Sequence, residues 1–348
     1  MALTLHTIDL EHDRESLLEL LERNLPGLPH ARRFSWLYRD NPAGQAWSWA
    51  VRETKTQELV GITSLFPRMI WINGQLDRCG QVGDFAINAS YRSLGPAIML
   101  QRATFQPVDQ ALIRFCYDCP PHDQGMAPLR RLGLRVSCRV EKYAKLQRSR
   151  REIEKRLGKG KVARSAAAVI DLFLSRRKGH RDQSRGIEIN QMEGPFDDEF
   201  TRLDEQVKNS FGLRSRRDAS TLNWRFLHDP LNTYRVLTAR YRRELVGYVG
   251  IAIRGEDAYI VDLFTLDMNE VAEELLRAAI DAIKGDPIQA LYVLIGEHSA
   301  IAPLLRHSGF HPRAPVANVV IYRRADTTVD SIPGEERGWY FAHVDLQA

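Results

Sequence analysis

The pattern of apolar and polar residues over positions 1–90 is dominated by short alternating runs. Alternation places every second side chain on one face, which is typical of half-buried strands. Asn73-Gly74 separates two such runs and predicts a tight hairpin turn, because both residues accept a positive φ. Strands are predicted over residues 3–8, 47–51, 59–66, 69–72, 75–79 and 82–87. This part of the chain therefore predicts an antiparallel meander.

Helical spacing appears once near the start of the chain and twice after the meander. Leu17, Leu18 and Leu21 share one helix face, and Pro26-Gly27 ends that helix. The elements predicted after the meander are strands over 111–117 and 137–143 and helices over 95–104 and 124–132. A meander followed by alternating helices and strands predicts an α+β fold with a mixed, mostly antiparallel sheet.

The second half of the chain repeats the first. Trp36, Tyr38 and Pro42 match Trp224, Phe226 and Pro230 at one constant spacing. Four further matches follow in the same order, at a spacing that shrinks slowly: 58–61 with 244–247, 83–85 with 261–263, 111–113 with 290–292, and 127–134 with 302–310. The repeated elements are predicted over 234–241, 244–253, 257–264, 270–284 and 288–294. This order predicts a tandem duplication.

The duplication sets the expected domain boundaries. The first copy is predicted over residues 1–145, a basic helical linker over 146–186, the second copy over 187–325 and a C-terminal tail over 326–348. The tail contains Trp339, Tyr340 and Phe341, so we expect it to pack back on a domain.

The linker carries a concentrated excess of positive over negative charge. Residues 145–185 hold 14 Lys and Arg against four acids, a net charge of +10, whereas the whole chain carries +5. Within it, Val162, Ala166, Val169, Ile170 and Phe173 lie on one helix face. Two interpretations stay open. The stripe packs between the copies, or it lies on an anionic membrane surface with the basic residues around it.

Composition narrows the class of protein. Hydrophobic residues make up 44% of the 348 positions, enough for two cores, and no run is long enough for a membrane span. The N-terminus has no basic region followed by an apolar run, so no secretory signal is expected. Four cysteines make no disulfide framework. These features favour a cytoplasmic location.

One segment predicts a binding site for phosphate. Residues 89–97 connect the strand over 82–87 to the next helix. Gly95 and Ala97 leave the backbone open, Pro96 suits the first helical turn, and Arg92 adds a cation. The free N–H groups of a first turn and the helix dipole both favour an anion. This arrangement predicts a pyrophosphate cradle.

The element order and the run Arg92-x-x-Gly95-x-Ala97 resemble the GNAT (N-acetyltransferase) superfamily and its acyl-CoA signature, Arg/Gln-x-x-Gly-x-Gly/Ala. The resemblance covers both copies and implies two tandem GNAT-like domains. It implies that Leu94, Gly95, Pro96 and Ala97, with Arg92, bind the CoA pyrophosphate. It also implies that Phe85, Ala86 and Ile87 pair with the pantetheine arm. The donor would be acetyl-CoA or another acyl-CoA, with no metal.

The second copy departs from this signature. It has Thr265-Leu266-Asp267-Met268-Asn269-Glu270 where the cradle would be, with no glycine and with two carboxylates. Negative charge at this place opposes binding of a pyrophosphate. We therefore expect a single acyl-CoA site, in the first copy, and a degenerate second copy.

The catalytic residues are less clearly indicated. Members of the superfamily often use a carboxylate on the strand before the cradle as a base, which here is Asp84, and a tyrosine as an acid, where this chain has Leu129. Tyr117, Asp118, His122 or Asp123 could replace that tyrosine. Asp84 matches Asp262 in the degenerate copy, so a supporting role in the sheet is the alternative.

Two other features have competing interpretations. Cys116 and Cys119 have the spacing of metal ligands, but no second pair follows, so a strand end is the simpler interpretation. Trp36 and Trp224 could stack on a ligand, yet their duplication favours packing that belongs to the fold.

These observations favour an acyl-CoA-dependent acyltransferase, most simply an N-acetyltransferase, acting on a small-molecule or cell-envelope-related acceptor. One alternative is a sensor that binds acyl-CoA without turnover, which the missing tyrosine allows. The other is a related tandem transferase that takes an aminoacyl group from tRNA. Against it, an acyl-CoA cradle would have no purpose there, so no nucleic-acid partner is expected. The sequence does not name the acceptor.

Overall fold

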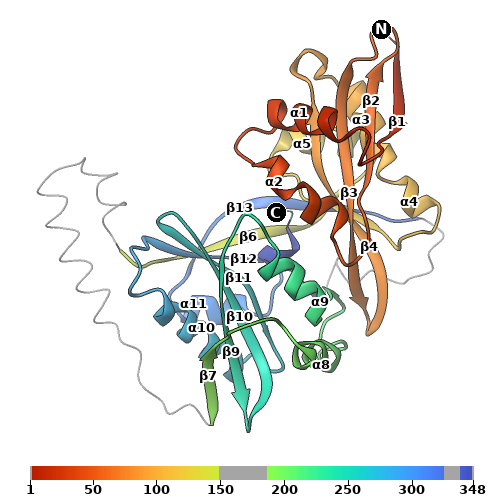
Figure 1. Cartoon of the computed structure of the whole chain (residues 1–348). Coiled ribbons are helices and arrows are strands. Elements are labelled where there is room, and N and C mark those ends of the chain that lie inside the picture. Colours follow the sequence, from red (N-terminus) through yellow and green to blue (C-terminus); the bar gives the residue numbers. More distant parts are fainter. Residues whose placement is uncertain (1, 149–185, 325–337, 347–348) are drawn as a thin grey trace, which may run out of the picture.

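A computed structural model describes residues 2–148, 186–324 and 338–346 (Figure 1). The predicted linker stripe, with its two interpretations, lies outside these residues, as does the tail up to residue 337. We call residues 2–148 the N-terminal half and residues 186–346 the C-terminal half. No helix of the described residues is long and apolar enough to cross a bilayer. The predicted α+β class with a mixed, mostly antiparallel sheet is confirmed.

The N-terminal half begins with a meander of long strands. Its strands are β1 (Leu3–Thr7), β2 (Trp47–Glu53), β3 (Leu59–Ile72), β4 (Gln75–Ile87), β5 (Cys116–Asp118) and β6 (Val136–Leu146). Its helices are α1 (Arg14–Asn24), α2 (His30–Phe34), η1 (Ser35–Arg39), η2 (Ala89–Tyr91), α3 (Leu94–Ala103), α4 (Gln106–Asp109) and α5 (Asp123–Arg131). Apolar residues of α1, α2 and η1 pack on one face of the strands, and those of α3 on the other.

The C-terminal half repeats this order of elements. Its strands are β7 (Ile187–Gln191), β8 (Leu213–Ser215), β9 (Tyr234–Tyr241), β10 (Glu244–Arg254), β11 (Asp257–Thr265), β12 (Ala290–Gly296), β13 (His311–Tyr322) and β14 (Trp339–Tyr340). Its helices are α8 (Asp198–Gln206), α9 (Ala219–Leu222), η3 (Asn223–Leu227), α10 (Glu270–Ala282), α11 (Ala302–His307) and η4 (His343–Asp345).

The two halves share one continuous sheet because their last long strands are exchanged. The order is β1-β2-β3-β4-β5-β13-β6-β12-β11-β10-β9-β7. Strand β13 pairs with β5 of the N-terminal half, and β6 pairs with β12 of the C-terminal half. Figure 1 shows β6 and β13 side by side between the halves. Each half therefore completes the sheet of the other.

Two tryptophans at matching positions bind the halves together through an almost symmetric contact. Trp36 lies on the π-helical turn η1, and Trp224 lies on the π-helical turn η3. Their rings stack with centroids 4.9 Å apart. Trp36 Nε1 donates to the Trp224 carbonyl at 2.7 Å, and Trp224 Nε1 donates to the Trp36 carbonyl at 2.8 Å. The predicted packing role of both residues is confirmed.

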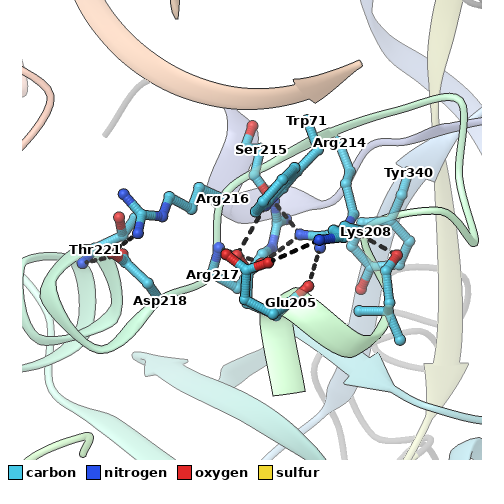
Figure 2. Close-up of polar contacts among 12 residues, drawn as sticks. Trp71, Glu205, Lys208, Arg214, Ser215, Arg216, Arg217, Asp218, Thr221 and Tyr340 are labelled. Carbon is cyan, nitrogen blue, oxygen red and sulfur yellow. Dashed lines mark hydrogen bonds and ion pairs between the residues drawn. The ribbon is translucent and has the colours of Figure 1, made fainter. Parts of the chain in front are cut away.

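A buried polar network adds a second link between the halves (Figure 2). Asp204 on α8 accepts a hydrogen bond from Trp71 Nε1 on β3 at 2.8 Å and one from the Arg217 backbone N–H at 2.8 Å. The same carboxylate pairs with Arg214, whose side chain is fully buried. Because each buried charge here has an opposite partner, removing one partner would leave the other uncompensated and lower the free energy of unfolding by about 3–5 kcal/mol.

The strand boundaries differ from the sequence prediction in two places. Residues 59–72 form one strand that passes through Pro67, and residues 75–87 form another, where four strands were predicted. The predicted turn between them is confirmed, with φ of 48° at Asn73 and 78° at Gly74. The strand predicted over 111–117 is wrong at its start, because Ala111 has φ of 58° and β5 begins only at Cys116. Ile113 fits the alternating pattern because it packs in a hydrophobic cluster, although it lies before the strand begins.

We predict that Trp36→Ala lowers the free energy of unfolding by about 3–5 kcal/mol, because it removes a buried ring and leaves the Trp224 carbonyl without its donor. Leu112→Ala is the control, since Leu112 is 53% exposed and should change little. Urea unfolding of both variants checks this. Equal stability of Trp36→Ala and the wild type would contradict the proposed role of the tryptophan contact.

Candidate functional site

Strands β4 and β5 separate in the middle of the N-terminal half. They run parallel and pair only at Gly80–Cys116 and Gln81–Tyr117. Beyond these pairs β4 continues to Ile87, whereas β5 ends at Asp118. The predicted pantetheine-pairing residues Phe85, Ala86 and Ile87 lie on the part of β4 that β5 does not pair with. No strand among the described residues pairs with this edge of β4, and the Ile87 carbonyl accepts a hydrogen bond from Arg92 Nε at 3.3 Å.

The N-terminus of α3 lies directly after this edge. Ser93 precedes the helix in extended conformation, and its side chain makes no capping hydrogen bond. Arg92, Ser93, Leu94 and Gly95 are exposed, whereas Pro96 and Ala97 are buried. A Cβ atom built on Gly95 would meet no atom within 4 Å. The first turn of α3 therefore presents uncapped N–H groups to open space, as an anion site requires.

Asp84 lies on a bulge of β4, but its carboxylate is already bound. Two β4 residues, Asp84 and Phe85, lie opposite Thr63, and Asp84 has φ of 47°. One carboxylate oxygen pairs with Arg33 at 2.5 Å, and the other accepts from the Tyr38 hydroxyl at 2.6 Å. All three side chains are buried. Asp262 of the C-terminal half has similar partners, Arg217 and Tyr248. This geometry favours a supporting role for Asp84.

Asp118 has a different environment at the end of β5. Its side chain is partly exposed and lies on the face of the sheet that α3 covers. Burial raises the pKa of Asp118 to about 7, although the Cys119 backbone N–H and Gln101 on α3 oppose the shift. Gln101 itself is buried. Its Nε2 atom has no hydrogen-bond partner among the described residues, although the Gln101 side chain lies close enough to Asp118 to lower the pKa of that carboxyl. A carboxyl group with a pKa near neutrality can exchange a proton during catalysis.

The other three catalytic candidates are placed less favourably, and one of them, Asp123, is exposed and pairs with Arg130 at 2.9 Å. Tyr117 is 1% exposed, and its hydroxyl donates to the Asp345 carbonyl at 3.0 Å. Burial raises its pKa well above the usual value. His122 is exposed and precedes α5 without capping it. The structure thus brings Asp118, Gln101 and the separated strands together, and leaves Tyr117 in the core and His122 at the surface. Gln101 was missed in the sequence because only the fold shows that it is buried.

The equivalent opening in the C-terminal half is filled by the chain itself. Strands β11 and β12 pair from Asp257–Ala290 to Ile260–Val293 and then separate. The C-terminal segment enters this gap, where Phe341 accepts a hydrogen bond from the Gly296 N–H at 3.1 Å. The space left among these residues is about 10 Å³. That volume is close to the minimum for one water molecule, so no ligand of the size of pantetheine fits.

The helix start in the C-terminal half is also closed to anions. The side chain of Asp267 accepts from the Asn269 backbone N–H at 2.8 Å, just before α10. Glu270 and Glu273 add negative charge in the first turn. These carboxylates place negative charge at the start of α10, which opposes binding of a phosphate there.

The comparisons with known proteins agree on the fold. No protein-family model and no curated protein matches the sequence. Among solved structures, a GCN5-related N-acetyltransferase from Anabaena variabilis matches with a TM-score of 0.65 at 15% identity, over 92% of this chain and 72% of that one. A probable N-acyltransferase of unknown function from Enterococcus faecalis matches with a TM-score of 0.65 at 12% identity, again over 92% and 72%.

A third match comes from a protein with its ligand in place. Saccharomyces cerevisiae N-myristoyltransferase with bound myristoyl-CoA has a TM-score of 0.58 at 14% identity, over 92% of this chain and 82% of that one. All three matches cover both halves. The chain therefore has the GNAT fold that the sequence resemblance implied.

Proposed function

We propose that this chain is an acyl-CoA-dependent acyltransferase whose one donor site lies between β4 and β5. The observation that carries this proposal is the uncapped, exposed start of α3 next to an unpaired strand edge. The helix start would bind the pyrophosphate through the N–H groups of its first turn, and Arg92 would add a positive charge. The pantetheine arm would pair with Phe85, Ala86 and Ile87, and Gln101 Nε2 would donate to one of its carbonyl groups.

The contrast between the halves supports a single donor site. In the C-terminal half the C-terminal segment fills the strand opening, and Asp267 occupies the helix start. This contrast supports placing the CoA pyrophosphate and its arm in the N-terminal half among the described residues.

Asp118 is the residue we propose for proton transfer. An acceptor amine would attack the thioester carbon, the carbon–sulfur bond would break, and CoA would leave as a thiolate. Protonated Asp118 would give its proton to that thiolate, while the amine would lose a proton to water. Asp84 is less suited to the task, since Arg33 and Tyr38 already bind both carboxylate oxygens. Its role would be to hold the bulged strand in place.

The proposal gives the acyl group and the acceptor by class. The structural neighbours include an acetyltransferase and a myristoyltransferase, so the proposal covers both short and long acyl groups. The acceptor is a small molecule or a cell-envelope component. A protein that binds acyl-CoA as a sensor would show binding without thiol release, and a transferase that depends on aminoacyl-tRNA would lose activity on treatment with ribonuclease.

We predict that Gly95→Glu abolishes acyl-CoA binding without changing stability. The new side chain would project into open space, so the fold tolerates it, but its carboxylate would occupy the phosphate position. The matched control is Gly285→Glu, because Gly285 is also exposed with open space around it and lies far along the sequence in the C-terminal half. Fluorescence competition with CoA measures both affinities. A similar affinity in the two variants would contradict the proposed cradle.

We predict that Asp118→Asn lowers the transfer rate about 10²-fold and removes the fall in rate above pH 7. The unfolded carboxyl ionises near its ordinary pKa of 3.8, whereas the folded one keeps its proton to about 7. Wild-type stability should therefore fall as pH rises from about 4 to about 7, and the variant should lack this contribution. Rate profiles and urea unfolding across this range measure both effects.

Asp84→Asn serves as the comparison for Asp118. It weakens the pair with Arg33, so we expect a smaller loss of activity and an unchanged fall in rate above pH 7. If Asp84→Asn removes that fall and Asp118→Asn leaves it in place, the assignment of the two carboxylates is reversed.

A further inference from the structure

Two buried arginines at the contact between the halves have no carboxylate partner among the described residues. They are Arg68 on β3 and Arg225 on η3, each 7% exposed. Arg68 Nη2 donates to Gln81 Oε1 at 3.0 Å, and Arg225 Nη2 donates to the Leu346 carbonyl at 3.2 Å. Burying a guanidinium without an opposite charge costs several kcal/mol by general estimates. Binding of an anion next to these guanidinium groups would offset that cost.

The unused hydrogen-bonding atoms of this cluster are all donors. Arg68 Nη1, Arg225 Nε, Arg225 Nη1 and Gln81 Nε2 are buried and make no hydrogen bond to any described residue. Other buried arginines of the chain do have partners. Arg214 pairs with Asp204, and Arg217 pairs with Asp262 and Asp345. The cluster therefore differs from the rest of the interior, where positive charge is neutralised by the fold.

The members of the cluster lie close together around the tryptophan contact. The Arg68 guanidinium lies 5.0 Å from the Trp224 ring, and that of Arg225 lies 5.6 Å from the Trp36 ring. Burial lowers the pKa of Arg68, and the charge of Arg225 lowers it further. Nearby His343 adds no charge, because burial and the neighbouring cations lower its pKa to about 3. Asp345 acts against the lowering of the Arg68 pKa, but its carboxylate pairs with Arg217, so the cluster carries a net positive charge.

The cluster also borders the proposed donor site. Gln81 is the last residue of β4 that pairs with β5, so the strands separate directly beyond it. Gln81 and Tyr117 are neighbours across this last pair, whereas Asp118 is the next residue of β5. An anionic group held by Arg68, Arg225 and Gln81 would therefore lie next to the point where the thioester is expected.

We propose that Arg68, Gln81 and Arg225 bind a carboxylate of the acceptor, so that the acceptor is a small amine that also carries a carboxylate. The inference rests on the proposed acyltransferase function and names its substrate class. Planar guanidinium groups match a carboxylate through paired N–H donors, and Gln81 Nε2 adds a third direction. Bound in this way, the acceptor would project its amine toward the separated strands.

The first experiment tests whether the arginine cluster binds a carboxylate, and it does not require catalysis. Thermal unfolding is followed in sodium acetate and in sodium chloride at equal ionic strength. We expect acetate to raise the Tm of the wild type and not that of Arg68→Met or Arg225→Met. Without acetate, Arg68→Met should be at least as stable as the wild type, because an apolar side chain replaces an unpaired charge. Arg214→Met is the control that should lose stability, since it leaves Asp204 unpaired.

The second experiment tests the class of acceptor. CoA thiol release from acetyl-CoA is measured with glycine and with glycinamide, which differ only in the carboxylate. We expect glycine to be the better acceptor by at least tenfold, and the preference to disappear in Arg68→Met. Arg313→Met, which removes an exposed arginine of β13, should keep the preference.

The outcomes separate this inference from the proposed function. Equal rates with glycine and glycinamide, or an acetate effect that survives in both Met variants, would overturn the carboxylate site while leaving acyl transfer intact. A strong loss of stability in Arg68→Met would show that the guanidinium is already paired within the chain, and would also overturn it. Absence of acyl-CoA binding would instead reject the proposed function.

Discussion

The pairing of backbone groups across the two halves is the constraint on which this structure depends. Strands β6 and β13 each lie in the sheet of the opposite half, so neither half can satisfy its N–H and C=O groups alone. The stacked tryptophans and the hydrogen bonds of Asp204 also stabilise the contact between the two halves. This exchange holds the parallel pairs β4–β5 and β11–β12 at fixed places, and each pair separates after a few residues.

The two strand openings differ in what lies between their strands, and among the described residues this difference favours a candidate site in the N-terminal half. In the C-terminal half, the segment from Trp339 to Leu346 fills the opening, and Tyr340 donates to the Asp262 carboxylate at 3.0 Å. In the N-terminal half the helix start is exposed, and a carboxyl with a raised pKa lies at the strand end. The charges of the two halves differ in the same way. Carboxylates lie at the start of α10, whereas guanidinium groups without a carboxylate partner among the described residues border the opening between β4 and β5.

Much of the fold and the exposed start of α3 could be predicted from the sequence, since both depend on local patterns. Alternation gave β9 its observed bounds, and Gly95 with Pro96 indicated an open helix start. The exchange of β6 and β13 could not be predicted, because alternation does not specify the partner of a strand. The surroundings of Asp84 and Asp118 were equally hidden. Both are acids at or near strand ends, and only the fold shows that Arg33 and Tyr38 bind the Asp84 carboxylate whereas burial raises the pKa of Asp118.

Titration calorimetry of the full chain with acetyl-CoA, and with CoA itself, tests the central claim most directly. The account predicts one binding site per chain, because the C-terminal segment fills the opening between β11 and β12 and carboxylates lie at the start of α10. Two equivalent sites per chain would contradict it, since the C-terminal segment would then have to leave the second opening. A single site that persists unchanged in Gly95→Glu would also contradict it, because the ligand would then lie outside the proposed cradle.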